Sequence, residues 1–447
     1  MSSTLLSLPT ELLLAIIDAI QDQKSLLNLV LTCRLARLLA EPILYRSMVI
    51  TAGSQAKCLA DALSSQQRFN FVESLDLFPE YHKETDIEAL TPTIGTMTHL
   101  RGLSMESSFA NYQRWRYTSR RWRDLLQGYR LLFSEAARGI GLQNLETLTI
   151  HWAGNENRFW RLTDISSIFK LPALQRLTLS CAALLDDLAA HLTDLPAGTT
   201  PLTNLHLIEC FVTPKAISAV LALPRALRSC HLGNLRHQEF HYPDEDHTEA
   251  LAESYLHALC QQRQSLENLV WTDAREDDDE EDDGHDTDFH HNGDRSLSDF
   301  TQLRNLTLDG PCTTFFSILL SKHAAPRHVE RLRLVRYAFT SSQIPSIPPA
   351  SEFCRYLPAL RNLDVILSNN ENPTPEFHPH WSVEDFRETL QRLGGDFRFA
   401  GQGVEVVVSM ETRGDRFISP YLFAEEVPRE RVVYRCGEEG EVFDIPA

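Results

Sequence analysis

The chain has 447 residues, enough for two or three domains or one long repeat array. A hydrophobic fraction of 43% indicates a globular protein and excludes a wholly disordered one. The net charge of −19 argues against broad nucleic-acid binding, which needs a basic face.

The nine cysteines are scattered singly, and none is paired as C-x-x-C. This pattern indicates buried thiols in a reducing compartment and suggests no metal cluster. The N-terminus lacks the basic start of a signal peptide, and Glu11 and Asp18 interrupt its apolar run. No uncharged stretch approaches the roughly 18 apolar residues that span a bilayer. We therefore expect a protein of the cytoplasm or nucleus, without a membrane partner.

The first fifty residues contain three short helical patterns, which is too little chain to bury a core alone. Ser7 and Pro9 favour a helix start, and apolar residues then recur at helical spacing. A polar break before Leu26 starts a second helix, whose apolar stripe continues to Leu38. A third helix is expected to begin near Ala40. A segment of this kind usually docks onto another surface.

Three motifs occur in order within this segment. They are Leu8-Pro9-x-Glu11-Leu12-Leu13-x-x-Ile16, Leu26-Leu27-x-Leu29-x-Leu31-Thr32-Cys33-Arg34, and Leu38-x-Ala40-Glu41-Pro42-x-Leu44-Tyr45-Arg46. Together they resemble the F-box, in the form common in fungal proteins, over residues 7 to 48. Many F-boxes carry a Trp after the Cys-Arg pair, where this chain has Leu35 and Ala36, and many end in Leu-Trp, where it has Leu44-Tyr45. Tyr can replace Trp as an aromatic anchor.

The resemblance implies that this segment binds a Skp-type adaptor through apolar side chains and, through the adaptor, a cullin. Carried over residue by residue, the adaptor-binding set is Leu8, Pro9, Leu12, Leu13, Ile16, Leu26, Leu29, Val30, Cys33 and Leu44. Which of them face the adaptor and which face the rest of the chain is left open. The alternative is a helical cap on the repeats that follow, since solenoids need caps. A cap only has to be amphipathic, so it does not account for the three motifs.

Downstream, one pattern recurs ten times: an apolar residue, two variable positions, usually Leu, one variable position and an apolar residue. Its central positions are Leu75, Leu103, Leu148, Leu177, Leu205, Cys230, Leu269, Leu306, Leu332 and Leu363. The pattern resembles the strand motif of the leucine-rich repeat, with irregular spacing of 25 to 45 residues. The Asn or Cys that the family places after the motif occurs once, as Cys210. We therefore expect no regular Asn ladder, and the repeat edges must be satisfied differently.

Helical stretches lie between the copies, so the predicted fold is α/β: a three-helix F-box followed by an irregular leucine-rich-repeat solenoid, with parallel strands on the concave face and helices outside. The alternative is an ordinary α/β domain whose strands show the pattern by chance, which ten copies disfavour. The variable positions should face the groove. Candidate target-binding residues there are Thr149, His151, Arg176, Asn204, His206, Asn305, Arg331 and Arg333. Their charges are mixed, and for most of them singly a solvated surface is the simpler interpretation.

Two insertions interrupt the repeats. Residues 112–123 combine five Arg with four aromatic residues, a composition that suits a protein interface, the packing of a helix or, less well, base stacking. The segment at about 274–296 holds ten carboxylates between Glu276 and Asp288, which predicts a disordered loop. Its histidines and carboxylates lack the spacing of an EF-hand, so no metal site is predicted.

Near the C-terminus, Ser382-x-x-Asp385 favours a helix that Gly394 could end, and a strand is expected at Val404 to Val408. The predicted domains are an F-box at residues 1–50, repeats at 51–410 and a loosely structured tail at 411–447. The sequence contains no nucleophile elbow, P-loop, H-E-x-x-H or Rossmann fingerprint. We expect no catalytic residue and no cofactor.

The resemblance implies a non-catalytic, substrate-recognition subunit of a Skp–cullin–F-box ubiquitin ligase, with the repeats holding a target protein. The alternative from a different class is a repeat scaffold with no ligase role and a degenerate F-box. The identity of the target stays open, as does any need for a modification or a small molecule.

Overall fold

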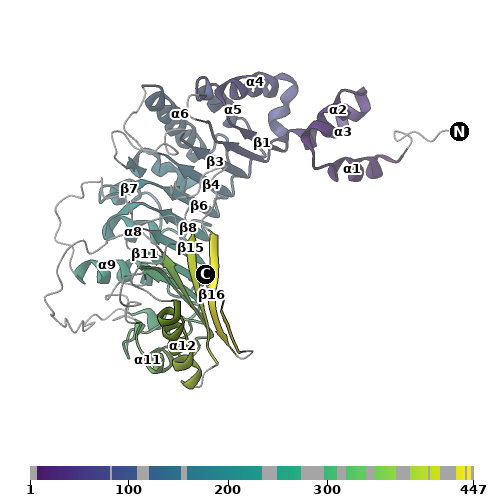
Figure 1. The fold of residues 1–447 in the computed structure, drawn as a ribbon. Coiled ribbons are helices and arrows are strands. Elements are labelled where there is room, and N and C mark those ends of the chain that lie inside the picture. Colours follow the sequence, from purple (N-terminus) through teal and green to yellow (C-terminus); the bar gives the residue numbers. More distant parts are fainter. Residues whose placement is uncertain are drawn as a thin grey trace. The chain divides into compact units, whose positions relative to one another are not determined.

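The computed structural model describes residues 8–80, 83–107, 120–152, 159–233, 249–272, 296–309, 319–338, 347–368, 383–400, 403–412, 429–437 and 440–443. The chain divides into two compact units. Figure 1 labels their helices and strands. The first unit is Met1–Arg158 with Asp164–Leu177, and the second is Phe159–Thr163 with Thr178–Ala447. Almost all of the acidic insertion and most of the Arg/aromatic insertion lie outside the described residues.

Three helices open the first unit: α1 (Thr10–Asp18), α2 (Gln23–Val30) and α3 (Arg34–Leu44). Asp22 caps α2, because its carboxylate accepts a hydrogen bond from the Ser25 amide at 2.8 Å. Cys33 caps α3 through its Sγ atom, which accepts from the Ala36 amide at 3.4 Å. The predicted break at Ala40 is wrong, because α3 continues through Pro42. A proline this close to a helix end removes only one backbone hydrogen bond.

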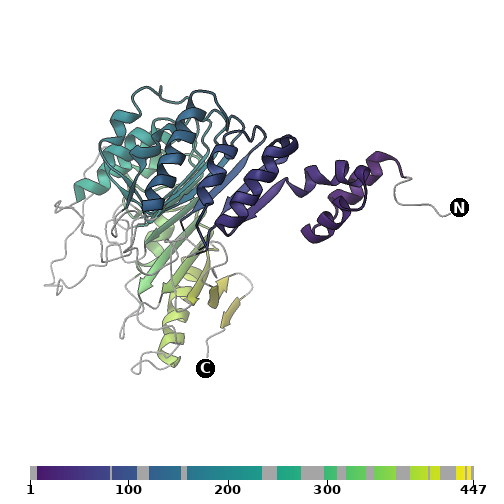
Figure 2. The same ribbon diagram turned by 90° about the horizontal axis from the view of Figure 1, so that it is seen from above.

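The first unit then forms a parallel sheet with the order β1 (Ser47–Ile50), β2 (Ser74–Leu77), β3 (Gly102–Glu106) and β4 (Thr147–His151). Its helical segments are α4 (Gly53–Ser64), η2 (Ser65–Phe71), η3 (Ile87–Leu90), α5 (Thr91–Ile94), α6 (Arg120–Ala137) and, from Asp164 on, η4 (Leu162–Lys170). Helix α4 packs beside β1 and η3 (Figure 2). The boundary between the units falls within β6 (Arg176–Ser180).

The second unit contains a longer parallel array. Its strands are β8 (Asn204–Ile208), β10 (Ser229–Gly233), β11 (Asn268–Thr272), β12 (Asn305–Asp309), β13 (Arg331–Ala338), β14 (Asn362–Ser368) and β15 (Glu405–Thr412). A small parallel sheet joins β5 (Trp160–Arg161), β7 (Ala182–Leu184) and β9 (Phe211–Val212). The helical segments are α7 (Leu188–His191), α8 (Pro214–Leu221), α9 (Glu249–Leu259), η5 (Cys260–Gln262), η6 (Leu297–Asp299), α11 (Ala350–Tyr356) and α12 (Val383–Phe399).

The apolar positions of the repeats form the core of both units. Leu75, Leu103 and Leu148 are paired in register across β2, β3 and β4, and all three are buried. Each such leucine stabilises the fold by about 2 kcal/mol when it leaves water. The positions between them are partly exposed, as alternation along a strand requires. The predicted α/β fold class, three N-terminal helices followed by parallel-strand repeats, is confirmed.

The C-terminal residues differ from the sequence prediction. The expected loose tail contains β16 (Arg429–Gly437) and β17 (Gly440–Phe443), which extend β15 in antiparallel fashion. Val433, Tyr434 and Cys436 are buried there. Among the described residues, no helix is both long and apolar enough to cross a bilayer.

Helix α12 also continues past Gly394, where the sequence suggested that it ends. A Cβ atom at Gly394 would lie 1.8 Å from the Tyr434 hydroxyl oxygen. The glycine is therefore needed so that the buried tyrosine of β16 can lie against the helix backbone.

Candidate adaptor-binding surface

The three N-terminal helices form a small apolar core of their own. Helices α1 and α2 both pack on α3, and Ile17, Leu26, Val30 and Ala40 make the buried cluster between them. Ile20, Leu29, Leu39, Ile43 and Leu44 are partly buried around it. The cluster uses only one face of each helix.

Large aliphatic side chains are exposed on other faces of these helices and at their ends. Leu12 is 52% exposed, Leu31 is 67% exposed and Leu38 is 62% exposed. The full exposed aliphatic set is Leu8, Leu12, Leu14, Ile16, Leu27, Leu31, Leu35 and Leu38. Leu12 and Ile16 lie four residues apart on α1, which places them on one helix face. Exposed aliphatic residues gathered in so short a segment are typical of a docking surface.

Polar contacts join α3 to the first repeat. The Glu41 carboxylate forms an ion pair with the Arg68 guanidinium of η2 at 2.6 Å, and both side chains are largely buried. The same guanidinium lies over the Tyr45 ring, 5.5 Å from its centroid. Arg46 also pairs with Asp18 at 2.8 Å in an exposed contact. Glu41 and Tyr45 therefore contact the first repeat, while the exposed aliphatic set stays at the surface.

Residues 5–51 match the F-box-like family model. The match covers all three helices and the strand that follows them. No curated protein matches the chain. Among solved structures, the chain is similar to an internalin from Listeria monocytogenes, with 10% sequence identity, 72% of this chain and 85% of that chain covered, and a TM-score of 0.30.

The F-box-like segment divides the predicted adaptor-binding residues into three groups. Leu8, Pro9, Leu12 and Ile16 are exposed, Leu29, Cys33 and Leu44 are partly buried, and Leu13, Leu26 and Val30 are buried. Leu26 and Val30 belong to the buried cluster of the three helices, and none of the buried three is accessible to a partner. The assignment of the others to an adaptor stays a prediction.

Sequence reasoning missed five members of the exposed aliphatic set: Leu14, Leu27, Leu31, Leu35 and Leu38. Their signal was present, because α1 and α2 each carry apolar residues beyond the single stripe that one core needs. A helix that is apolar on two faces has a second surface to bury.

The predicted groove residues fall in both units. In the first, Thr149 is partly buried, and the exposed Arg176 donates to the Thr147 hydroxyl at 3.1 Å. In the second, Asn204 and His206 lie on β8, and the His206 ring centroid is 6.1 Å from that of His231 on β10. Burial lowers the pKa of His206. These side chains offer a partner mostly neutral hydrogen-bonding groups.

The arginines of the second unit are already paired with carboxylates. Arg331 contacts the buried Asp364 of β14 at 2.6 Å. Arg333 forms an ion pair with Glu430 of β16. The sequence prediction did not include this contact, because it gave residues 411–447 as a loosely structured tail. On β12, Asn305 donates to the Asn268 carboxamide at 2.6 Å. The two arginines therefore do not mark this strand face as basic.

His151 is the predicted groove residue that is not accessible. Its side chain is 1% exposed, and within the described residues neither ring nitrogen has a hydrogen-bond partner. Burial lowers its pKa from 6.5 to about 3, so the ring is neutral at physiological pH. The described residues contain no group of His, Cys, Asp or Glu that could hold a metal ion.

His151→Leu should flatten the pH dependence of folding. Because the folded pKa is depressed, the contribution of neutral His151 is fully present above pH 6.5 and is lost as the pH falls towards 3. At pH 5 the loss in the wild type is about 2 kcal/mol. Chemical unfolding at pH 7 and pH 5 measures the difference. The control is His191→Leu, at an exposed position, which should keep the wild-type change of unfolding free energy with pH. The same change with pH in His151→Leu as in the wild type would contradict the prediction.

Proposed function

We propose that this chain is a substrate-recognition subunit of a Skp–cullin–F-box ubiquitin ligase. The F-box-like segment binds a Skp-type adaptor and, through it, a cullin, and the strand face of the repeats holds a target protein. The transfer chemistry resides on partner enzymes. The chain contributes proximity, because holding a target lysine near the charged enzyme raises its effective concentration. Cytoplasm or nucleus is the proposed compartment.

The observation that carries this proposal is the exposed aliphatic set on α1, α2 and α3. A helical cap would bury these side chains against the first repeat. Here the contacts of Glu41 and Tyr45 with Arg68 join the segment to η2, and leucines such as Leu12 and Leu31 remain in water. The apolar surface is therefore available to a second protein, as the F-box-like match suggests.

A second candidate function is a repeat scaffold whose F-box-like segment no longer binds an adaptor. It is favoured by Tyr45, which stands where many F-boxes have Trp and which here lies under Arg68. In that case the repeats would still bind protein, but no cullin would be recruited.

The deciding experiment mixes the purified full-length chain with a recombinant Skp-type adaptor and measures complex formation by size-exclusion chromatography and calorimetry. A stable complex that then recruits a cullin supports the ligase subunit. A wild-type chain that binds no adaptor supports the scaffold. Affinity purification of the wild type and of a variant lacking residues 8–46 then separates the partners, because target candidates are retained by both forms.

A further inference from the structure

The residue immediately before each repeat strand alternates in charge along much of the chain. In the first unit the series is Arg46, Glu73, Arg101 and Glu146. In the second unit it is Arg228, Glu267, Arg304, Glu330 and Arg361. Glu405, the first residue of β15, continues the alternation one position further along its strand. From Glu73 to Arg361, these residues occupy the first variable position of the repeat pattern. Neither the F-box-like match nor the proposed function accounts for this row, which we call the charge ladder.

Backbone hydrogen bonds hold neighbouring members of the charge ladder side by side. The Glu73 carbonyl accepts from the amides of Arg101 and Gly102 at 2.8 and 3.0 Å. In the second unit, the Arg228 carbonyl accepts from the amides of Glu267 and Asn268 at the same distances. Similar pairs of bonds continue to Asn362. Since neighbouring strands lie about 4.8 Å apart, each side chain lies within ionic range of the next.

Several neighbours form ion pairs. Arg304 contacts Glu330 at 3.4 Å, and Arg228 contacts Glu267 at 3.8 Å. In the first unit Arg101 contacts Glu146 at 3.7 Å. All these side chains are partly exposed, so each pair alone is weak. A row of alternating charges has a larger effect than one pair, because reversing a single charge places it between two neighbours of the same sign.

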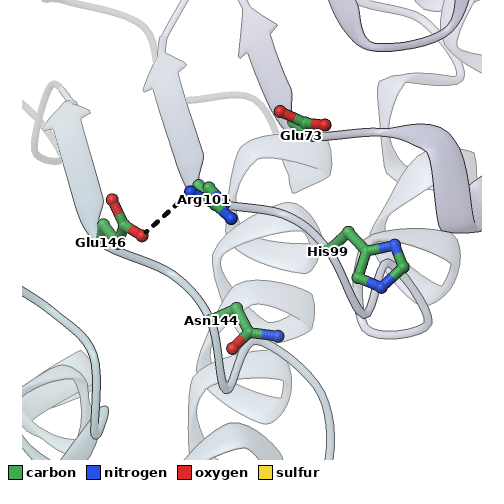
Figure 3. Close-up of a pocket in the computed structure, with 5 residues that line it drawn as sticks. All are labelled: Glu73, His99, Arg101, Asn144 and Glu146. Atoms are coloured by element: carbon green, nitrogen blue, oxygen red, sulfur yellow. Dashed lines mark ion pairs between the residues drawn. The ribbon is translucent and has the colours of Figure 1, made fainter.

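Figure 3 shows the charge ladder in the first unit, where it lines a pocket of about 340 Å³. Glu73, Arg101 and Glu146 precede three adjacent strands, and His99 and Asn144 lie in the turns beside them. The His99 ring nitrogen Nδ1 is 2.6 Å from the Asn70 carbonyl, and Asn144 donates to the Thr98 carbonyl at 2.8 Å. The polar groups of this pocket thus connect one repeat to the next.

We propose that the charge ladder fixes the order and register of the repeats, and so replaces the Asn ladder that this sequence lacks. The repeats are 25 to 45 residues apart, so their helical sides differ and cannot supply one common contact. The N-terminal start of the strand is the part that every repeat shares. Pairing a strand with the wrong neighbour, one repeat away, would bring two like charges together. This inference does not depend on the proposed ligase role.

The test is Arg304→Glu, which places a carboxylate between Glu267 and Glu330. The ion pair with Glu330 becomes a repulsion, and Glu267 gains a like-charged neighbour. The unfolding temperature of the full-length chain should therefore fall by about 3–6 °C at low salt. The fall should shrink in 1 M NaCl, where exposed charges are screened. Arg392→Glu, the same change on the exposed face of α12, should have little effect. An unfolding temperature equal to that of the wild type would overturn the proposal.

A second arm separates alternation from the identity of each charge. Reversing all six charges from Arg228 to Glu405, together with Arg435, which pairs with Glu405 at 3.6 Å, keeps every neighbour opposite. This variant should unfold within about 2 °C of the wild type. If this variant unfolds at a lower temperature than Arg304→Glu, the alternation of charge is not what stabilises the order of the repeats. A double-mutant cycle of Arg304→Gln and Glu330→Gln needs no large redesign and should show a favourable coupling between the two side chains; a coupling of zero would also overturn the proposal.

Discussion

Leu12→Asp should abolish adaptor binding by an otherwise folded protein. Leu12 is 52% exposed on α1 and lies outside the buried cluster of the three helices, so the substitution leaves that core intact. In a complex, the new carboxylate would be buried in an apolar contact without a partner, at a cost of several kcal/mol. Calorimetry with a purified Skp-type adaptor should show affinity weakened by about 100-fold or more.

The matched control is Leu131→Asp on α6, where the leucine is 58% exposed and belongs to the repeats. It should bind the adaptor as the wild type does. Leu13→Asp is not informative, because Leu13 is 3% exposed and the change would test folding. Equal adaptor affinity for Leu12→Asp and the wild type would remove α1 from the proposed surface. Circular dichroism shows whether each variant is folded.

Glu41→Ala should loosen the connection between α3 and the first repeat. Glu41 and Arg68 are only 11% and 15% exposed, so the substitution removes the Glu41 carboxylate from a largely buried guanidinium. Breaking a buried pair in this way costs about 3 kcal/mol. Hydrogen exchange at α3 and η2 should accelerate by about 100-fold, since each 1.4 kcal/mol is a factor of ten.

Two further variants make this prediction specific. Glu41→Ala combined with Arg68→Ala should recover part of the protection, because no buried charge remains. Glu80→Ala breaks the exposed pair with Lys83 and should change exchange little. A double variant no better protected than Glu41→Ala would show that the ion pair does not hold the junction. Adaptor affinity should survive in all three, since none of them changes a member of the exposed aliphatic set.

The ten repeat strands could be read from the sequence, including the degenerate copy around Cys230, which forms β10. The reason is local: a two-residue period buries alternate side chains on one face of a strand, so the pattern survives irregular spacing. The F-box motifs were likewise visible as ordered helical patterns. Of the exposed aliphatic set, only Leu8, Leu12 and Ile16 were predicted. Helical spacing identifies an apolar residue but does not say which of two apolar faces packs into the core.

Other features depended on contacts between distant residues. The sequence of strand β16 does not follow the repeat pattern. Its antiparallel pairing with β15 nevertheless buries Val433 and Tyr434. Gly394 resembled a helix end, but the approach of Tyr434 explains it instead. His151 had the alternation of a groove residue and is nevertheless buried.

The sequence by itself determined the N-terminal F-box-like helices, the ten strands and the parallel α/β class, because each rests on the spacing of apolar residues along a few consecutive positions. Only the tertiary structure decided which leucines remain exposed, that Glu41 and Tyr45 contact Arg68, and that Arg and Glu alternate side by side at the strand entrances. Those properties depend on which residues the fold brings together from positions about 25 to 45 residues apart, a distance over which sequence spacing carries no direct information.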